Sequence, residues 1–203
     1  MMTKHVARLL VFAVFASPVL AQVAPASDLQ LSMKKLAAQA HKIAQATSNE
    51  EKAKGWLLLN RLAAKFGEQM NRAFPNTTIH GDKIDPPQAQ RLAQQATSYG
   101  VKVDFCEIGA DWGASNEGYL KYLELWPNGP EADEATWMGP MGNQSYCGDF
   151  EGSAEELQEI MSQNQRFIAQ FPGSRHTPEA KQRLADAQKM LAELQKSQSK
   201  DKK

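Results

Sequence analysis

The sequence predicts an all-α protein built from stacked antiparallel helical hairpins, and three observations support this fold class. First, one pattern of aromatic residue, proline, tight turn and acidic helix start occurs twice, with residue 122 corresponding to 167 at an offset of 45 residues. A fixed offset of this size is a mark of repeat architecture. Second, apolar residues recur at three- and four-residue steps in most segments, which indicates amphipathic helices. Third, only one stretch of the chain alternates apolar and polar residues. The repeat-packing positions are Tyr122, Trp126, Pro127 and Ala135 in the first copy and Phe167, Phe171, Pro172 and Ala180 in the second.

Residues 1–21 have the composition of a secretory signal peptide. Lys4 and Arg8 precede an apolar run over residues 9–16, and small or apolar side chains lead up to Ala21. A buried apolar helix is the alternative, but the basic start and the small residues favour a signal peptide, and the run is too short for a stable membrane anchor. The sequence therefore predicts a mature chain that is periplasmic or secreted. It begins at Gln22, which has no thiol for lipid attachment.

The N-terminal region, residues 22–100, is predicted to begin with a helical hairpin. The first helix covers residues 28–46 and has one apolar face. Ser48 or Asn49 caps the second helix, which ends at Phe74-Pro75. The link is short, so the two helices should pack antiparallel. The aromatic-proline pair at the end of this hairpin suggests a degenerate first copy of the repeat.

A third helix is predicted over residues 85–99, between a capping Asp85 and a terminating Gly100. His80-Gly81-Asp82 lies in the loop before it. A His beside an Asp suits a metal ligand or a base, but no second group is placed by spacing, so we assign it to the loop. The alternating stretch Val101–Cys106 fits a short strand or an extended linker. Because no partner strand is visible, we predict a linker.

The repeat region covers residues 101–195. In its first copy, Asn116 is predicted to cap a helix that ends at Trp126, and a short helix follows over residues 133–138. An aromatic residue at the end of one helix and a small alanine near the start of the next allow close packing, while proline stops the first helix.

In the second copy, Ser153 and Glu156 have the spacing of a capping box, so a helix should begin there and end at Phe171. The last helix opens at Thr177. Residues 196–203 are polar and basic, and we predict a disordered tail.

Charge is unevenly distributed, although the net charge of the chain is zero. Residues 101–160 hold 2 basic and 13 acidic side chains, whereas the regions before and after are net basic. Phosphate binding needs clustered Lys and Arg, so nucleic acid is not an expected partner of this block. The block predicts an acidic interaction face, with an ordinary solvated surface as the alternative. The candidate face residues are Glu107, Asp111, Asp133, Glu134 and Asp149.

The chain has two cysteines, Cys106 and Cys147. In an exported protein an even count favours a disulfide over two free thiols. The bond would close a loop around the first repeat copy, worth about 4 kcal/mol on the chain-entropy model. Redox catalysis is disfavoured because a C-x-x-C spacing is absent.

The repeat resembles a known family. Residues 167–174, with Pro178-Glu179-Ala180 and Leu184, resemble the tetratricopeptide-type repeats of bacterial envelope proteins. The similarity is to outer-membrane assembly lipoproteins and periplasmic cell-division coordinator proteins. It covers residues 119–194, and residues 50–99 loosely, with a longer period than the usual length of about 34 residues. The resemblance implies a short solenoid whose surface binds a peptide or helix of a partner.

We therefore predict a non-catalytic protein-interaction or scaffold module of the cell envelope. Its expected partner is an envelope protein or peptide, with no cofactor, no metal and no stable membrane insertion. One alternative is a peptidoglycan- or carbohydrate-associated protein, and a less favoured one is a small glycoside hydrolase. Clustered carboxylates can act as acid and base, and Trp112, Trp126 and Trp137 can stack on sugar rings. The same carboxylates suit Ca²⁺, but neither EF-hand spacing nor a catalytic motif is present.

Overall fold

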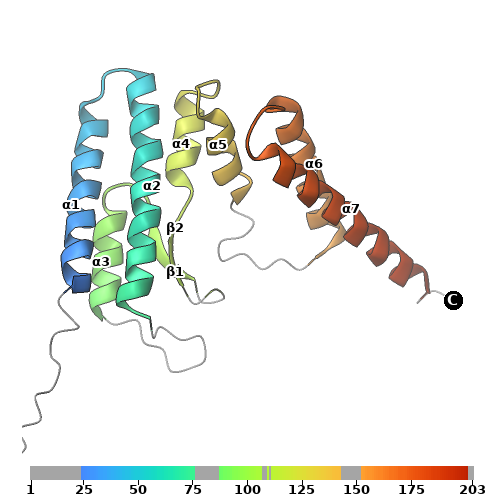
Figure 1. Cartoon of the computed structure of the whole chain (residues 1–203), viewed down its shortest axis with the longest axis horizontal. Coiled ribbons are helices and arrows are strands. Elements are labelled where there is room, and N and C mark those ends of the chain that lie inside the picture. The colour runs from blue at the N-terminus through green and yellow to red at the C-terminus, as the bar shows by residue number, and fades with distance from the viewer. Residues whose placement is uncertain (1–23, 76–86, 107–108, 110, 143–151, 201–203) are drawn as a thin grey trace, which may run out of the picture.

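The computed structural model describes residues 24–75, 87–106, 109, 111–142 and 152–200, and within these ranges seven helices and one two-stranded sheet form the fold (Figure 1). The predicted signal peptide, the His80–Asp82 loop and the helix start at Asp85 lie outside the described residues. None of the described helices is long and apolar enough to cross a membrane. The expectation of a mostly helical protein is confirmed.

The first hairpin consists of α1 (Ala24–Gln45) and α2 (Asn49–Ala73). Ser48, one of the two predicted candidates, caps α2, and Asn49 is its first residue. Its hydroxyl accepts a hydrogen bond from the Glu51 N–H at 3.2 Å, and the Glu51 carboxylate accepts one in return from the Ser48 N–H, completing a capping box. Gly55 lets the two helices approach closely, because a Cβ at this position would lie 2.6 Å from Cγ1 of Ile43.

The helix α3 (Pro87–Thr97) completes the N-terminal core through three buried alanines. Gly100 follows with a φ of +109°, a conformation that glycine adopts at little cost, and the chain turns away from the helix as predicted. The largest core cluster joins α1, α2, α3 and the sheet; its members include Leu36, Leu59, Phe66, Met70, Ala93, Val101 and Trp112.

The predicted linker at residues 101–106 is wrong. Val103–Cys106 forms strand β1, which pairs antiparallel with β2 (Asp111–Ala114) in the register Val103↔Ala114. Trp112 in β2 is 4% exposed and packs in the N-terminal core. The outer edge of β1 bonds to α3, because the Val103 N–H donates to the Thr97 hydroxyl at 3.0 Å. A lone two-stranded hairpin is marginal in water, so its burial against α2 and α3 explains its presence.

The second hairpin is α4 (Glu117–Leu125) with α5 (Ala132–Met138), and the third is α6 (Ala154–Gln170) with α7 (Thr177–Lys200). Figure 1 shows the three hairpins following one another from blue to red across the molecule. The predicted capping box of α6 is confirmed, since the Ser153 hydroxyl accepts from the Glu156 N–H at 3.2 Å.

Two predictions about helix ends need correction. Asn116 stands at the N-cap of α4 but does not cap it. Its backbone is not extended, and its Nδ2 donates instead to the Gly139 carbonyl at 2.7 Å. The disordered tail was predicted from residue 196, but α7 remains helical to Lys200. The added residues include Gln and Lys, which are good helix formers.

Candidate functional site

The two predicted repeat copies have the same local structure. Trp126 and Phe171 are the C-caps of α4 and α6, with φ/ψ of −149°/67° and −127°/61°. The Trp126 N–H donates to the Tyr122 carbonyl at 2.8 Å, and the Phe171 N–H donates to the Phe167 carbonyl at the same distance. Tyr122 and Phe167 are both fully buried. The aromatic residue thus closes the last turn of the helix immediately before proline in both copies.

The degenerate first copy shares this ending. Phe74 is the C-cap of α2 with φ/ψ of −129°/60°, and its N–H donates to the Met70 carbonyl at 2.8 Å. Pro75 follows it, as proline follows the other two aromatic caps. The same local geometry therefore ends α2, α4 and α6.

The turn and the second helix also correspond between the two copies. The Ala135 N–H donates to the Glu131 carbonyl, and the Ala180 N–H donates to the His176 carbonyl, each at 2.9 Å. Both alanines have 0% exposure, which fits their predicted role as the small residues where paired helices meet. Residues at the same offset in the two copies therefore make equivalent backbone hydrogen bonds.

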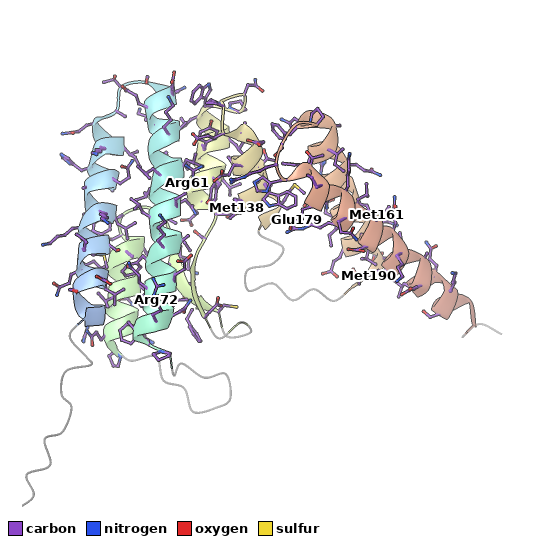
Figure 2. The ribbon with its side chains drawn as sticks, viewed as in Figure 1. Arg61, Arg72, Met138, Met161, Glu179 and Met190 are labelled. Atoms are coloured by element: carbon purple, nitrogen blue, oxygen red, sulfur yellow. The ribbon has the colours of Figure 1, made fainter. Side chains whose placement is uncertain are left out.

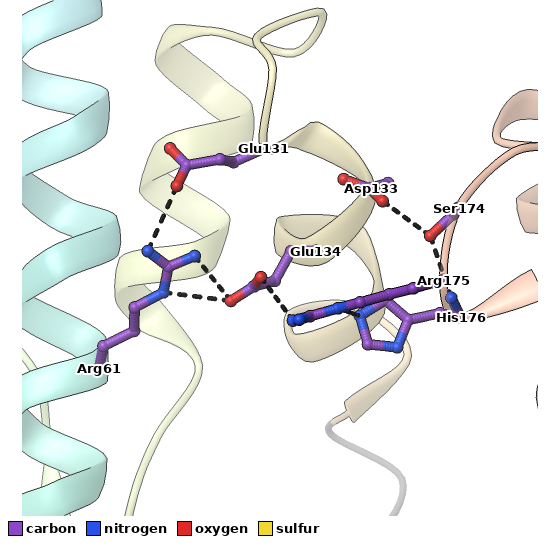
Figure 3. A network of polar contacts seen from close by, with 7 residues as sticks. All are labelled: Arg61, Glu131, Asp133, Glu134, Ser174, Arg175 and His176. Carbon is purple, nitrogen blue, oxygen red and sulfur yellow. Dashed lines mark hydrogen bonds and ion pairs between the residues drawn. The ribbon is translucent and has the colours of Figure 1, made fainter.

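A polar network connects the first, second and third hairpins (Figure 3). Arg61 of α2 donates from Nε and Nη2 to Oε1 of Glu134 at 3.1 and 2.8 Å, and from Nη1 to Glu131 at 3.3 Å. Arg175, in the turn between α6 and α7, donates to the other carboxylate oxygen of Glu134 at 2.7 Å. One carboxylate on α5 therefore bridges two arginines on different hairpins.

The electrostatics of Arg61 follow from this bridge. Partial burial of its guanidinium disfavours the charge, but the hydrogen bonds and the Coulombic attraction of Glu134 and Glu131 outweigh that cost and raise the pKa of Arg61. The Glu134 side chain is 20% exposed, whereas that of Arg175 is 70% exposed. The Arg61–Glu134 pair is therefore the better shielded half of the bridge.

Next to the bridge, the Ser174 hydroxyl donates to the Asp133 carboxylate at 2.7 Å and accepts from the His176 N–H at 3.2 Å. The His176 ring stacks on Trp137 of α5, with ring centroids 5.0 Å apart. Burial and the neighbouring Arg175 cation lower the pKa of His176. The turn before α7 is thus bound to α5 by both polar and aromatic contacts.

Trp137 is the centre of the apolar contact between the second and third hairpins. Its ring lies 5.3 Å from that of Phe167, and the guanidinium of Arg183 lies 4.3 Å from its centroid. Trp137 is 6% exposed and belongs to a buried cluster with Met141, Phe167 and Ala180. The indole therefore has a packing role, and its buried ring is not available to stack on a sugar.

The structure places the predicted acidic residues in different surroundings. Asp133 and Glu134 lie in the network between hairpins, and Asp111 lies half-buried at the start of β2. Glu107 and Asp149 are outside the described residues. Asp133 and Glu134 are therefore next to each other but bonded within the chain, and their role in binding a partner stays a prediction.

Cys106 is 3% exposed in β1, and its Sγ accepts a hydrogen bond from the Gly109 N–H at 3.3 Å. Cys147 is outside the described residues, so the Cys106–Cys147 disulfide stays a prediction.

The sequence did not reveal Arg61, Ser174, Arg175 or His176 as site residues. Their partners on α5 lie 39 to 73 positions away, and charge alone does not identify which acid each arginine meets. Among the described residues, no three His, Cys, Asp or Glu side chains gather in a way that could hold a metal ion.

The α4–α5 and α6–α7 hairpins, each with an aromatic C-cap, form a region of helical repeats similar to the tetratricopeptide type. Residues 111–197 match the YfiO family, described as outer membrane lipoprotein. This match supports a tetratricopeptide-like envelope protein over the repeat region and does not include α1, α2 or α3. No curated protein matches the chain, and no solved structure matches it either.

Proposed function

We propose that this protein is a non-catalytic scaffold of the cell envelope that binds a partner protein through its repeat region. The observation that carries the proposal is the repeated hairpin itself, since the segment with two matching copies is also the segment similar to an envelope family. Stacked helical hairpins present extended surfaces, and such surfaces commonly bind peptides or helices. The family's description names a lipoprotein, but with Gln22 after the predicted cleavage site, a lipid anchor is not part of our proposal.

The surface of the repeat region carries apolar side chains suited to this function. Met138 at the end of α5 is 43% exposed, and Met190 on α7 is 42% exposed. Figure 2 shows Met138 on the second hairpin and Met161 and Met190 on the third. Methionine is flexible and polarisable, and it is frequent on surfaces that bind helices.

The proposal can be tested by capture from envelope extract with the mature chain, residues 22–203, followed by mass spectrometry. The test variant is Met138→Glu/Met190→Glu. The control is Leu31→Glu on α1, where a still more exposed apolar residue, at 52%, lies outside the repeat region. We expect the wild type and the control to capture the same few envelope proteins, and the double variant to lose them. If the double variant retains every partner, or the wild type enriches none, the proposal is wrong.

A further inference from the structure

A groove of about 540 Å³ lies between α1 and α2 beside the turn that joins them. Its lining comes from α1, that turn and α2, so no other described element covers it. The size is within the usual range for binding sites. The residues that matter for its chemistry are Lys42 and Ile43 on α1 and Lys54, Gly55 and Leu58 on α2.

The groove has two large apolar side chains, Ile43 and Leu58, beside the buried amide of Gln39. Gly55 is buried and the helices are in close contact there, because a Cβ would lie 2.6 Å from Cγ1 of Ile43, which is half-buried beside it. Leu58 is 45% exposed at the groove, which is unusual for a leucine in a helix whose other apolar residues are mostly buried. An apolar side chain of a partner would remove Leu58 from water.

The sides of the groove are cationic. Lys42 and Lys54 line it. Lys35 precedes Lys42 by seven residues and Lys65 follows Leu58 by seven, so each lies on the same helix face two turns further from the hairpin turn. Among the residues that the structure describes, no acid pairs with Lys35, Lys42 or Lys65.

The acids near the groove are at its turn end and are already bonded. Glu51 accepts hydrogen bonds from the backbone N–H groups of Thr47 and Ser48 at 3.2 and 3.3 Å as part of the α2 cap. Glu50 pairs with Lys54 at 2.7 Å. Lys54 also lies over the Trp126 ring, 5.2 Å from its centroid, so it is held by contacts within the chain. The positive charge that remains along the groove is therefore that of Lys35, Lys42 and Lys65.

We propose that this groove binds an acidic amphipathic helix of a partner protein. The inference rests on the proposed scaffold function and adds a second surface, outside residues 111–197. A groove between two antiparallel helices accepts a third helix, whose apolar side chains would contact Ile43 and Leu58. Carboxylates beside that apolar stripe would face Lys35, Lys42 and Lys65. A flat bilayer surface would not enter the groove.

The probe is a labelled synthetic helix of about 18 residues, with leucine on one face and glutamate on the other, measured by fluorescence anisotropy at two salt concentrations. The same helix with lysine in place of glutamate is the peptide control. The test variant is Lys35→Glu/Lys42→Glu, and Leu58→Asp tests the apolar contact separately. The protein control is Lys181→Glu/Lys189→Glu on α7, which changes the net charge by the same amount at two exposed positions.

We expect the acidic helix to bind the wild type and the α7 control equally, and the groove variants at least about tenfold more weakly, with affinity falling as salt rises. Circular dichroism of each variant shows whether the helices are retained, and Leu58→Asp leaves both lysines in place if the double reversal does not fold. Three results would overturn the inference: equal binding of the lysine helix, equal loss in the α7 control, or a homodimer that the groove variants dissociate. If the peptide does not bind but envelope capture depends on Met138 and Met190, the groove proposal alone is refuted. If the peptide binds but capture does not depend on these methionines, the repeat-surface scaffold is refuted.

Discussion

Gly118 is the position where a single methyl group should disturb the packing of the repeat region on the N-terminal core. A Cβ added there would lie 2.6 Å from the Trp56 carbonyl oxygen and 2.7 Å from Cβ of Asn60. The Gly118 N–H donates to Oδ1 of the buried Asn60 at 2.7 Å, and Asn60 donates to the Ser115 carbonyl at 3.0 Å. The contact atoms include backbone, so α4 must move away from α2 to accept alanine.

The expected cost of Gly118→Ala follows from three effects. Overpacking costs about 1–3 kcal/mol. Weakening the buried hydrogen bond to Asn60 costs about 1–3 kcal/mol more. The higher helix propensity of alanine offsets about 1 kcal/mol of this loss of stability. The net loss in the free energy of unfolding should be about 3 kcal/mol, which lowers Tm by about 6–12 °C in a protein of this size.

Urea and thermal unfolding of wild type and variant, followed by circular dichroism at a helical wavelength, measure this loss. The control is Gly173→Ala in the turn between α6 and α7, because a Cβ there meets no atom within 4 Å. The control should differ from the wild type by less than about 0.5 kcal/mol. If Gly118→Ala is as stable as Gly173→Ala, α4 does not pack on α2 as closely at Gly118 as the structure shows.

Two further predictions concern the network between hairpins. Glu134→Gln should lower the free energy of unfolding by about 1 kcal/mol, because it weakens the pairing of half-buried Arg61. The control Glu124→Gln, in an exposed pair, should lower it by less than about 0.5 kcal/mol. Equal losses of stability in urea unfolding would argue against the bridge. The pKa of His176 is lower in the folded protein than its ordinary value of 6.5, so the unfolded chain binds more protons and stability should fall as pH decreases through that value. His176→Gln should remove this part of the pH dependence of the urea midpoint, and an unchanged profile would contradict it.

Features that depend on neighbouring residues could be predicted from the sequence. The capping boxes at Ser48 and Ser153 each need only four consecutive residues, and both are present. The aromatic caps at Phe74, Trp126 and Phe171 depend on the proline that follows each of them. Their shared geometry could therefore be inferred from a recurring motif.

Features that depend on distant partners could not be predicted in the same way. Strand β2 has only Trp112 as a large apolar residue and contains Gly113, so its composition does not indicate a strand. It forms because Trp112 is buried in the N-terminal core and because the Asn71 side chain bonds its backbone, with the Trp112 N–H donating at 2.6 Å. The prediction for β1 was wrong for the same reason, since its partner could not be recognised.

The acidic block shows why charge in a sequence does not by itself locate an interaction surface. Asp133 and Glu134 belong to the most acidic part of the chain, yet they bond to Ser174, Arg61 and Arg175 and so join hairpins to one another. These internal bonds also neutralise two of the arginines that would otherwise be free. Lys54 beside the α1–α2 groove is paired with Glu50, but Lys35, Lys42 and Lys65 have no such partners among the described residues. Charge available to a partner is what remains after internal pairing, and along that groove the remainder is positive, although the repeat region is acidic in sequence.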